Sequence, residues 1–131
     1  MTKADTFDKA TRLAMKGDLK LYDEIVHSDY ESMNQRVPVN KEMSKSILSG
    51  IGDLITVGPM HRIYENEEFL CIQRYLRNES TKGNFVWSLV SGINCIDGKI
   101  IRHETSAEEL DYDPCEGRDW NWKDYESLGG R

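Results

Sequence analysis

The chain has 131 residues, of which 38% are hydrophobic, enough for one domain with a single core. Its 17 basic and 23 acidic residues give a net charge of −6, which excludes the basic surface that binding along a nucleic-acid backbone requires. No apolar run approaches the roughly 18 residues of a membrane span, and the start lacks the apolar segment of a signal peptide, so we expect a cytoplasmic protein without nucleic-acid or membrane partners.

Amphipathic spacing predicts three helices in the first half of the chain. Apolar residues from 5 to 16 recur at helical intervals until Gly17 and Asp18 break the pattern. Residues 19–27 repeat that spacing, and Asp18 is a suitable N-cap for a second helix. After a short strand over residues 30–37, Asn40 is expected to cap a third helix that reaches residue 55.

The second half of the chain has the pattern of strands. We expect four of them, over residues 60–65, 69–77, 84–96 and 99–105, separated by polar turns. Helices that precede an antiparallel meander are typical of an α+β domain. The predicted architecture is three N-terminal helices packed on a curved antiparallel sheet.

The dipeptide Asp97-Gly98 predicts a two-residue type I′ turn between the last two strands. With Ile96 opposite Lys99, His103 would pair with Gly92. Its face of the sheet would then hold, by alternation, Ser88, Val90, Asn94, Ile101 and Thr105. A symmetric hairpin around residues 78–83 would add Phe69, Cys71, Gln73 and Tyr75 to that side.

The same register predicts a second apolar face, which includes Trp87, Leu89 and Ile93. Helices can cover only one face of a sheet, and large apolar groups rarely stay exposed. We therefore expect a homodimer that packs sheet to sheet.

Residues 107–131 differ from the rest of the chain in composition. Eight acidic and three basic residues give this segment a charge of −5, and it also holds Trp120, Trp122 and Tyr125. Aromatic residues are not typical of a purely solvating acidic tail. We expect a domain over residues 1–106 and an acidic aromatic tail, which either packs on its own domain or the dimer or recruits another protein.

The order of these elements, the Gly17-Asp18 break and the late Asp97-Gly98-Lys99-Ile100 sequence together resemble the NTF2-like superfamily, and within it the SnoaL-like polyketide cyclase branch. The resemblance covers about residues 5–106. It implies a cone-shaped, commonly homodimeric α+β domain with a pocket between its helices and the concave face of the sheet. Such a resemblance does not imply one reaction, because the superfamily includes isomerases, cyclases, dehydratases and non-catalytic binders.

The sequence departs from two catalytic patterns of that superfamily. Where ketosteroid isomerases of this fold carry their tyrosine, base and protonated aspartate, the corresponding positions here hold Ala10, Asn34 and Val90. SnoaL-like cyclases often show a His-x-Asp pair on the last strand, and here His103 is followed by Thr105. Steroid-isomerase chemistry is therefore disfavoured, and the acid of the cyclases is missing.

His103 is the candidate catalytic residue, because imidazole titrates near neutral pH and exchanges protons with a bound carbonyl or enol. The alternative is a hydrogen-bonded structural histidine. Arg62 and Arg74 are the basic groups of the predicted sheet most able to hold an anion, unless they form ion pairs or lie in solvent. The candidate substrate-binding residues are Asn34, Gln73, Tyr75, Ser88, Tyr30 and Thr105.

Cys71, Cys95 and Cys115 are widely spaced and odd in number, which favours buried thiols over a disulfide framework. The sequence has no His-Glu-x-x-His, Gly-x-Gly-x-x-Gly or Gly-x-Ser-x-Gly pattern, so we expect no metal and no cofactor. Two functions remain open. One is a cofactor-independent cyclase or isomerase that moves a proton next to a carbonyl of a small, largely apolar ligand. The other is a non-catalytic module that binds a small ligand or another protein.

Overall fold

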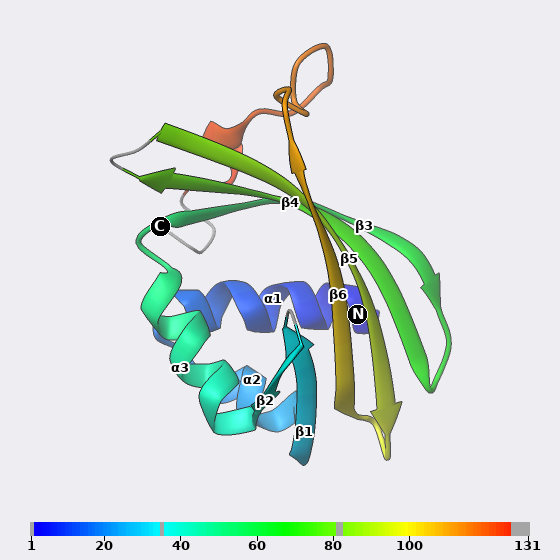
Figure 1. The fold of residues 1–131 in the computed structure, drawn as a ribbon. Helices are drawn as coiled ribbons and strands as arrows, with labels where there is room; N and C mark the ends of the chain where they lie inside the picture. The colour runs from blue at the N-terminus through cyan, green and yellow to red at the C-terminus, as the bar shows by residue number, and fades with distance from the viewer. Residues whose placement is uncertain (1, 35, 81–82, 127–131) are drawn as a thin grey trace.

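The computed structural model describes residues 2–34, 36–80 and 83–126. It contains three α-helices, six strands and a short 3-10 helix, and it confirms the α+β class (Figure 1). The helices and strands, in chain order, are α1 (Lys3–Met15), α2 (Lys20–Ile25), β1 (Val26–Asn34), β2 (Val37–Asn40), α3 (Lys41–Ile51), β3 (Ile55–Glu65), β4 (Phe69–Ser80), β5 (Gly83–Ile96), β6 (Lys99–Leu110) and η1 (Trp122–Asp124).

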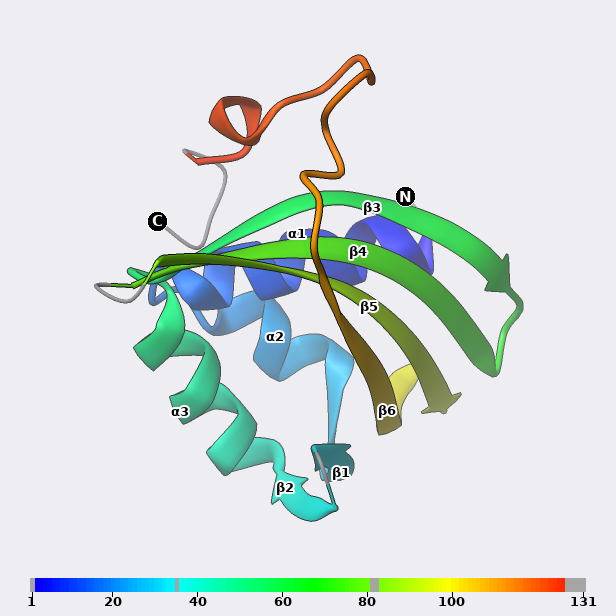
Figure 2. The ribbon, with the colours of Figure 1, turned by 45° about the horizontal axis from the view of Figure 1, so that its top comes forward.

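The strands form one curved sheet in the order β2-β1-β6-β5-β4-β3. Figure 2 shows the three helices on the concave side of this sheet, which we call the inner face, and the C-terminal segment on the opposite, outer face. No helix of the described residues is long and apolar enough to span a membrane. Cys71, Cys95 and Cys115 are free thiols, each partly buried.

One detail of the predicted architecture is not confirmed and another is wrong. The strand expected before the third helix is a hairpin of β1 and β2 between α2 and α3, so the three helices are not one N-terminal group. Strand β1 also pairs with β6 in parallel, which makes the sheet mixed rather than antiparallel. Most of the domain separates these two strands in sequence, and no tight turn between them imposes the antiparallel direction.

The helices hold the inner face through a core that α1 dominates. Phe7, Ala10 and Ala14 of α1 are at most 5% exposed and pack with Leu70 of β4 and Ile93 of β5. Side-chain caps start two of the three helices: Thr2 and Asp5 form a capping box on α1, and the Asn40 side chain accepts from the backbone N–H of Met43 as predicted. The predicted N-cap of the second helix is wrong, because the N-cap of α2 is Leu19, and Asp18 accepts instead from the backbone N–H of Lys20.

The turn between β5 and β6 confirms the prediction, whereas the register beyond it does not. Asp97 and Gly98 both have positive φ, as a type I′ turn requires, and Ile96 pairs with Lys99. After the pair Cys95–Ile100 the register shifts by one residue, at a β-bulge. His103 therefore pairs with Ile93 and not with Gly92.

Because side chains alternate along a strand, this shift exchanges the two faces of β5 relative to His103. Ser91 and Leu89 share the inner face with His103, whereas Ser88 and Val90 lie on the outer face. Trp87, Leu89 and Ile93, which were expected to form a second, exposed apolar face, therefore lie on the inner face that the helices cover. The apolar face from which a sheet-to-sheet homodimer was expected is thus covered within a single copy of the chain.

The described part of the C-terminal segment packs on the outer face. The Trp120 ring stacks on Tyr75 of β4, with 5.9 Å between the ring centroids. Trp122 is 4% exposed, lies against Gly58 of β3 and donates from its indole N–H to Asp113 at 3.1 Å. Both tryptophans therefore pack against strands β3 and β4 of their own chain.

Gly52, which follows α3, is a close-contact point between α3 and the end of α1. A Cβ at Gly52 would overlap the carbonyl oxygen of Met15, whereas a Cβ at Gly50, inside α3, meets no atom within 4 Å. We expect Gly52→Ala to lower the free energy of unfolding by about 2–3 kcal/mol. Gly50→Ala is the control and should be neutral or raise stability by about 0.5–1 kcal/mol. Urea unfolding measures both, and equal effects would contradict the packing described.

Candidate functional site

A cavity of about 440 Å³ lies between the helices and the inner face of the sheet. Every α-helix, and every strand except β3, contributes described residues to its wall. Most of the lining is apolar, including Phe7 and Met15 of α1, Ile47 of α3, Ile72 of β4 and Leu89 of β5. A largely apolar cavity with a few polar groups is the ordinary form of a small-molecule site.

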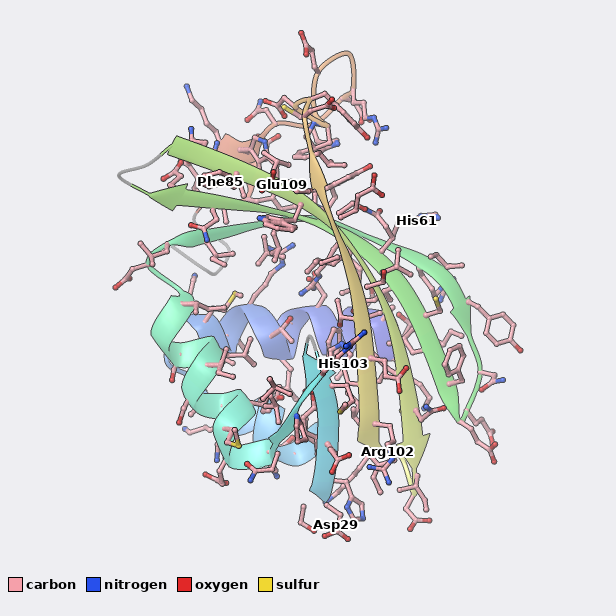
Figure 3. The ribbon with its side chains drawn as sticks, viewed as in Figure 1. Asp29, His61, Phe85, Arg102, His103 and Glu109 are labelled. Atoms are coloured by element: carbon pink, nitrogen blue, oxygen red, sulfur yellow. The ribbon has the colours of Figure 1, made fainter. Side chains whose placement is uncertain are left out.

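His103 of β6 contributes the imidazole of this cavity. Figure 3 shows its side chain on the side of β6 that faces the helices, whereas His61 lies on the outside of β3. The His103 Nδ1 is 3.1 Å from the Tyr30 hydroxyl, and its Nε2 is 3.1 Å from the Thr105 Oγ1. The Phe7 ring meets the imidazole edge to face at 5.7 Å between centroids. Both ring nitrogens thus have hydroxyl partners.

Further hydroxyl groups continue this polar row along the cavity wall. The Thr105 Oγ1 is 2.8 Å from the Ser91 Oγ, and the Tyr22 hydroxyl is 2.5 Å from the Ser44 Oγ. Neither pair includes a charged atom. The uncharged polar part of the cavity is therefore built from hydroxyls around one imidazole.

Burial sets the protonation states of this group. It lowers the pKa of His103 to about 4, with the positive charge of Arg74 as a second, smaller cause. Burial also raises the pKa of Tyr30 and the pKa of Tyr22, since it disfavours the phenolate. At neutral pH the site therefore presents a neutral imidazole beside protonated phenols.

Arg74 of β4 is the charged residue of the cavity wall, and it is 7% exposed. Its Nη2 donates to the Asp8 Oδ1 at 2.8 Å, and the same oxygen accepts from the Arg12 Nε at 2.9 Å. Burial lowers the pKa of Arg74 to about 10, so its guanidinium remains charged at neutral pH. No aspartate or glutamate is among the described residues that line the cavity.

The structure brings three of the predicted site residues together: His103, Tyr30 and Thr105 all line the cavity. Asn34 ends β1, but its side chain lies outside the part of the chain that the structure describes.

The other three predicted residues, Gln73, Tyr75 and Ser88, lie on the outer face. Gln73 donates to Ser88 there at 3.1 Å, and Tyr75 lies under Trp120. The bulge between β5 and β6 is the reason, because it places this face of β4 and β5 opposite to His103.

Sequence reasoning missed Tyr22, Ser44 and Ser91 as cavity residues. Tyr22 falls on the apolar stripe of the second helix, so its spacing indicated a core residue. In the uninterrupted register, alternation placed Ser91 with Leu89 and Ile93 on the face away from His103. Its pairing with Thr105 depends on the bulge, for which the sequence offers no local signal.

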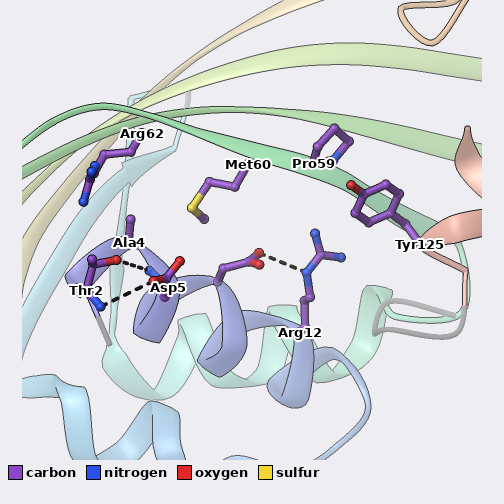
Figure 4. A pocket seen from close by; sticks show the side chains of 9 residues that line it. Thr2, Ala4, Asp5, Arg12, Pro59, Met60, Arg62 and Tyr125 are labelled. Carbon is purple, nitrogen blue, oxygen red and sulfur yellow. Dashed lines mark hydrogen bonds and ion pairs between the residues drawn. The ribbon is translucent and has the colours of Figure 1, made fainter. Parts of the chain in front are cut away.

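A second hollow, of about 420 Å³, lies between another face of α1, β3 and Tyr125 (Figure 4). Its charged side chains have partners: Asp5 with the backbone N–H of Thr2 at 3.4 Å, Asp8 with Arg12 at 2.9 Å, and Arg62 with Glu65 at 3.8 Å. Neither a histidine nor a cysteine is among the described residues that line it. Within the described residues no cluster of three or more histidine, cysteine or acidic side chains could hold a metal. We therefore take the cavity around His103 as the candidate site.

No protein-family model matches the chain, and no curated protein matches it. Solved structures resemble it over most of its length. IdmH, a candidate polyketide cyclase from Streptomyces antibioticus, has a TM-score of 0.64 and 15% sequence identity, over 79% of this chain and 90% of IdmH. An NTF2-like protein from Anabaena variabilis has a TM-score of 0.64 and 12% identity, over 79% and 84% of the two chains. A candidate SnoaL-like polyketide cyclase from Jannaschia has a TM-score of 0.63 and 12% identity, over 82% and 90%.

The chain therefore has the NTF2-like fold, and the resemblance expected from the sequence is confirmed at that level. The solved structures it resembles include a candidate SnoaL-like polyketide cyclase. Since folds of this kind carry several reactions, the reaction has to be argued from the cavity.

The low pKa of His103, about 4 against an ordinary 6.5, makes the stability of the protein depend on pH. Between these two values the unfolded chain binds a proton that the folded chain does not, so the free energy of unfolding falls as the pH drops from about 6.5 to about 4. The loss from this group amounts to roughly 2–3 kcal/mol. We expect His103→Gln to remove it, so that urea unfolding at pH 7 and pH 4.5 differs less in the variant than in the native protein. Identical pH dependence in both would show that the imidazole is not buried.

Proposed function

We propose that the chain is a cofactor-independent enzyme of the cyclase or isomerase type, in which His103 moves a proton next to a carbonyl of a small, largely apolar ligand. The observation that carries the proposal is a neutral, partly buried imidazole held between two hydroxyls in the wall of a 440 Å³ cavity. A neutral imidazole accepts a proton directly, and an apolar cavity excludes the water that would compete for it.

The geometry supports Nε2 of His103 as the atom that takes the proton. Nδ1 lies beside Tyr30, which is buried and surrounded by the hydroxyls of Ser32, Ser44 and Tyr22. A hydrogen bond from Nδ1–H to the Tyr30 oxygen leaves the lone pair on Nε2. Nε2 faces the hydroxyl of Thr105, and Thr105 is exposed. A ligand can therefore replace this hydroxyl as the hydrogen-bond partner of Nε2. Tyr30 is then a positioning residue, and Thr105 a ligand contact.

The reaction has two proton transfers. Nε2 removes a proton from the carbon next to the carbonyl, and the electron pair of the C–H bond moves into an enolate. The imidazolium then returns the proton to a different carbon in an isomerisation. In a cyclisation the enolate carbon attacks a second carbonyl, and the new alkoxide takes the proton. Neither sequence consumes a cofactor, an oxidant or a reductant.

Proton exchange tests this role without the natural substrate. The probe is 2-tetralone in D₂O, whose protons next to the carbonyl exchange when a base removes them. The native protein should accelerate exchange, and His103→Gln should lower the rate by about 100-fold or more, as loss of a general base does. His61→Gln is the matched control, since His61 is exposed on the outer face.

The rates are read by NMR, and the urea midpoint of each variant confirms that it is folded. Exchange that His103→Gln leaves unchanged would contradict the proposed role of His103.

One observation favours a second candidate, a non-catalytic module that binds a small ligand. The described residues of the cavity wall include no carboxylate that could act as a second acid or base. Binding of 2-tetralone without any exchange in the native protein would support this candidate over the enzyme. The described tail aromatics pack on their own domain, so they do not favour a protein-recruiting tail.

We propose further that two copies associate through the outer face of the sheet. Tyr64 and Val90 are 54% and 41% exposed and belong to the outer rows of β3 and β5. Val90→Glu should therefore shift the chain toward the monomer in sedimentation velocity, because a buried unpaired charge opposes association. Val37→Glu, at the edge strand β2, is the control and should leave the distribution unchanged. A native protein that sediments as a monomer would contradict the association.

A further inference from the structure

Arg74 places an incompletely satisfied cation in the cavity wall. Arg74 is 7% exposed, and its Nη2 donates to Asp8 at 2.8 Å. Nη1 reaches the Thr11 Oγ1 only at 3.4 Å, and Nε is buried with no hydrogen-bond partner among the described residues. Nε itself is closed off from the cavity, but buried polar groups are nearly always paired, so the fold leaves part of this guanidinium's donor capacity unused.

The charges around this guanidinium do not cancel. Asp8 is shared between Arg74 and Arg12, through the same carboxylate oxygen. Arg12 otherwise donates to the backbone carbonyl oxygens of Val57 and Gly58, which carry no formal charge. Two guanidinium groups against one carboxylate leave one positive charge. No acidic side chain is among the described residues lining the cavity, and on that wall the charge meets only the face of the Phe7 ring, 5.6 Å from the Arg74 Cζ, which carries no formal charge.

We propose that Arg74 is the anion-binding residue of the cavity and that its ligand is a monoanionic organic acid, with a carboxylate or enolate oxygen on an apolar body. The inference rests on the proposed function, because it concerns the same cavity, and it adds the chemical class of the ligand. The apolar body would lie against the aliphatic and aromatic lining, and the charged oxygen would supply the acceptor that the guanidinium lacks. A neutral apolar ligand would leave the buried charge uncompensated.

An anion on Arg74 would also strengthen His103 as a base. The groups around the imidazole are Tyr30 of β1, Thr105 of β6, Phe7 of α1 and Arg74 of β4, and Arg74 is the charged one. The positive charge of Arg74 helps to hold the pKa of His103 low. A bound anion offsets that charge, so the pKa of the imidazole rises when the ligand arrives. An enolate formed during reaction would be stabilised by the same contact.

The test compares two probes of nearly equal shape, naphthalene-2-carboxylate and naphthalene-2-carboxamide, by isothermal titration calorimetry. The native protein should bind the acid about 10- to 100-fold more tightly than the amide, the range expected for hydrogen bonds to a charged partner. Arg74→Gln should abolish this preference, whereas Arg74→Lys should retain part of it. Arg62→Gln is the matched control, because it removes an arginine that lines the other hollow. This variant should prefer the acid over the amide as strongly as the native protein does.

One measurement on the native protein keeps the test decisive if Arg74→Gln does not fold. The Nε–Hε resonance of Arg74 should shift when the acid is added and remain in place with the amide. Equal affinities for the two probes, or an Arg74 resonance that the acid leaves unchanged, would overturn the anion site.

These outcomes separate the anion site from the proposed function. Equal affinities together with 2-tetralone exchange that depends on His103 would overturn the anion site alone. A preference for the acid without any exchange would support the anion site and contradict the enzyme. Binding of neither probe would overturn the anion site, and the exchange experiment would then decide the function by itself.

Discussion

The pairing of β5 with β6 determines which side chains the cavity receives. A single bulge after Cys95–Ile100 moves every later pair by one residue, and alternation along the strands turns that shift into an exchange of faces. His103 thereby lies opposite Ile93, and Ser91 comes within hydrogen-bond distance of Thr105. Without the bulge, Ser88 and Val90 would share the face of His103. The chemistry of the cavity depends on this one irregularity.

The cavity combines a neutral base with one buried cation and has no carboxylate among its described lining residues. The fold tolerates the buried guanidinium of Arg74 because it donates hydrogen bonds to the carboxylate of Asp8 and to the hydroxyl of Thr11, both on α1. The same arrangement joins α1 to β4, so Arg74 both supports the helix over the sheet and charges the cavity wall. Burial keeps the imidazole of His103 neutral. The site therefore differs from a His-x-Asp site, in which an aspartate supplies the acid.

The parts of the fold that could be predicted are those with a local cause. Asn40 caps α3 because its side chain accepts from a nearby backbone N–H, and Asp97-Gly98 forms its turn because both residues tolerate positive φ. His103 and Thr105 are two residues apart on one strand, so they share a face in any register. This is why these two site residues were predicted correctly although the pairing used to place them was wrong.

The remaining features depend on contacts between distant parts of the chain. The parallel pairing of β1 with β6 brings Tyr30 to His103, across 73 positions of sequence, and no turn indicates it. Gln73, Tyr75 and Ser88 were misplaced because their position depended on a register that a single inserted residue changes. The charge of Arg74 became informative only when its partner Asp8 was known to be shared with Arg12, because an arginine on a strand is ordinarily paired or solvated.

The central claim is that the His103 imidazole is withdrawn from water into a cavity and is neutral there. An NMR titration of its ring proton between pH 3 and pH 8, in the protein without ligand, tests this claim most directly. We expect a midpoint near 4 for His103. A midpoint for His103 near 6.5, the ordinary value for a solvated histidine, would contradict it.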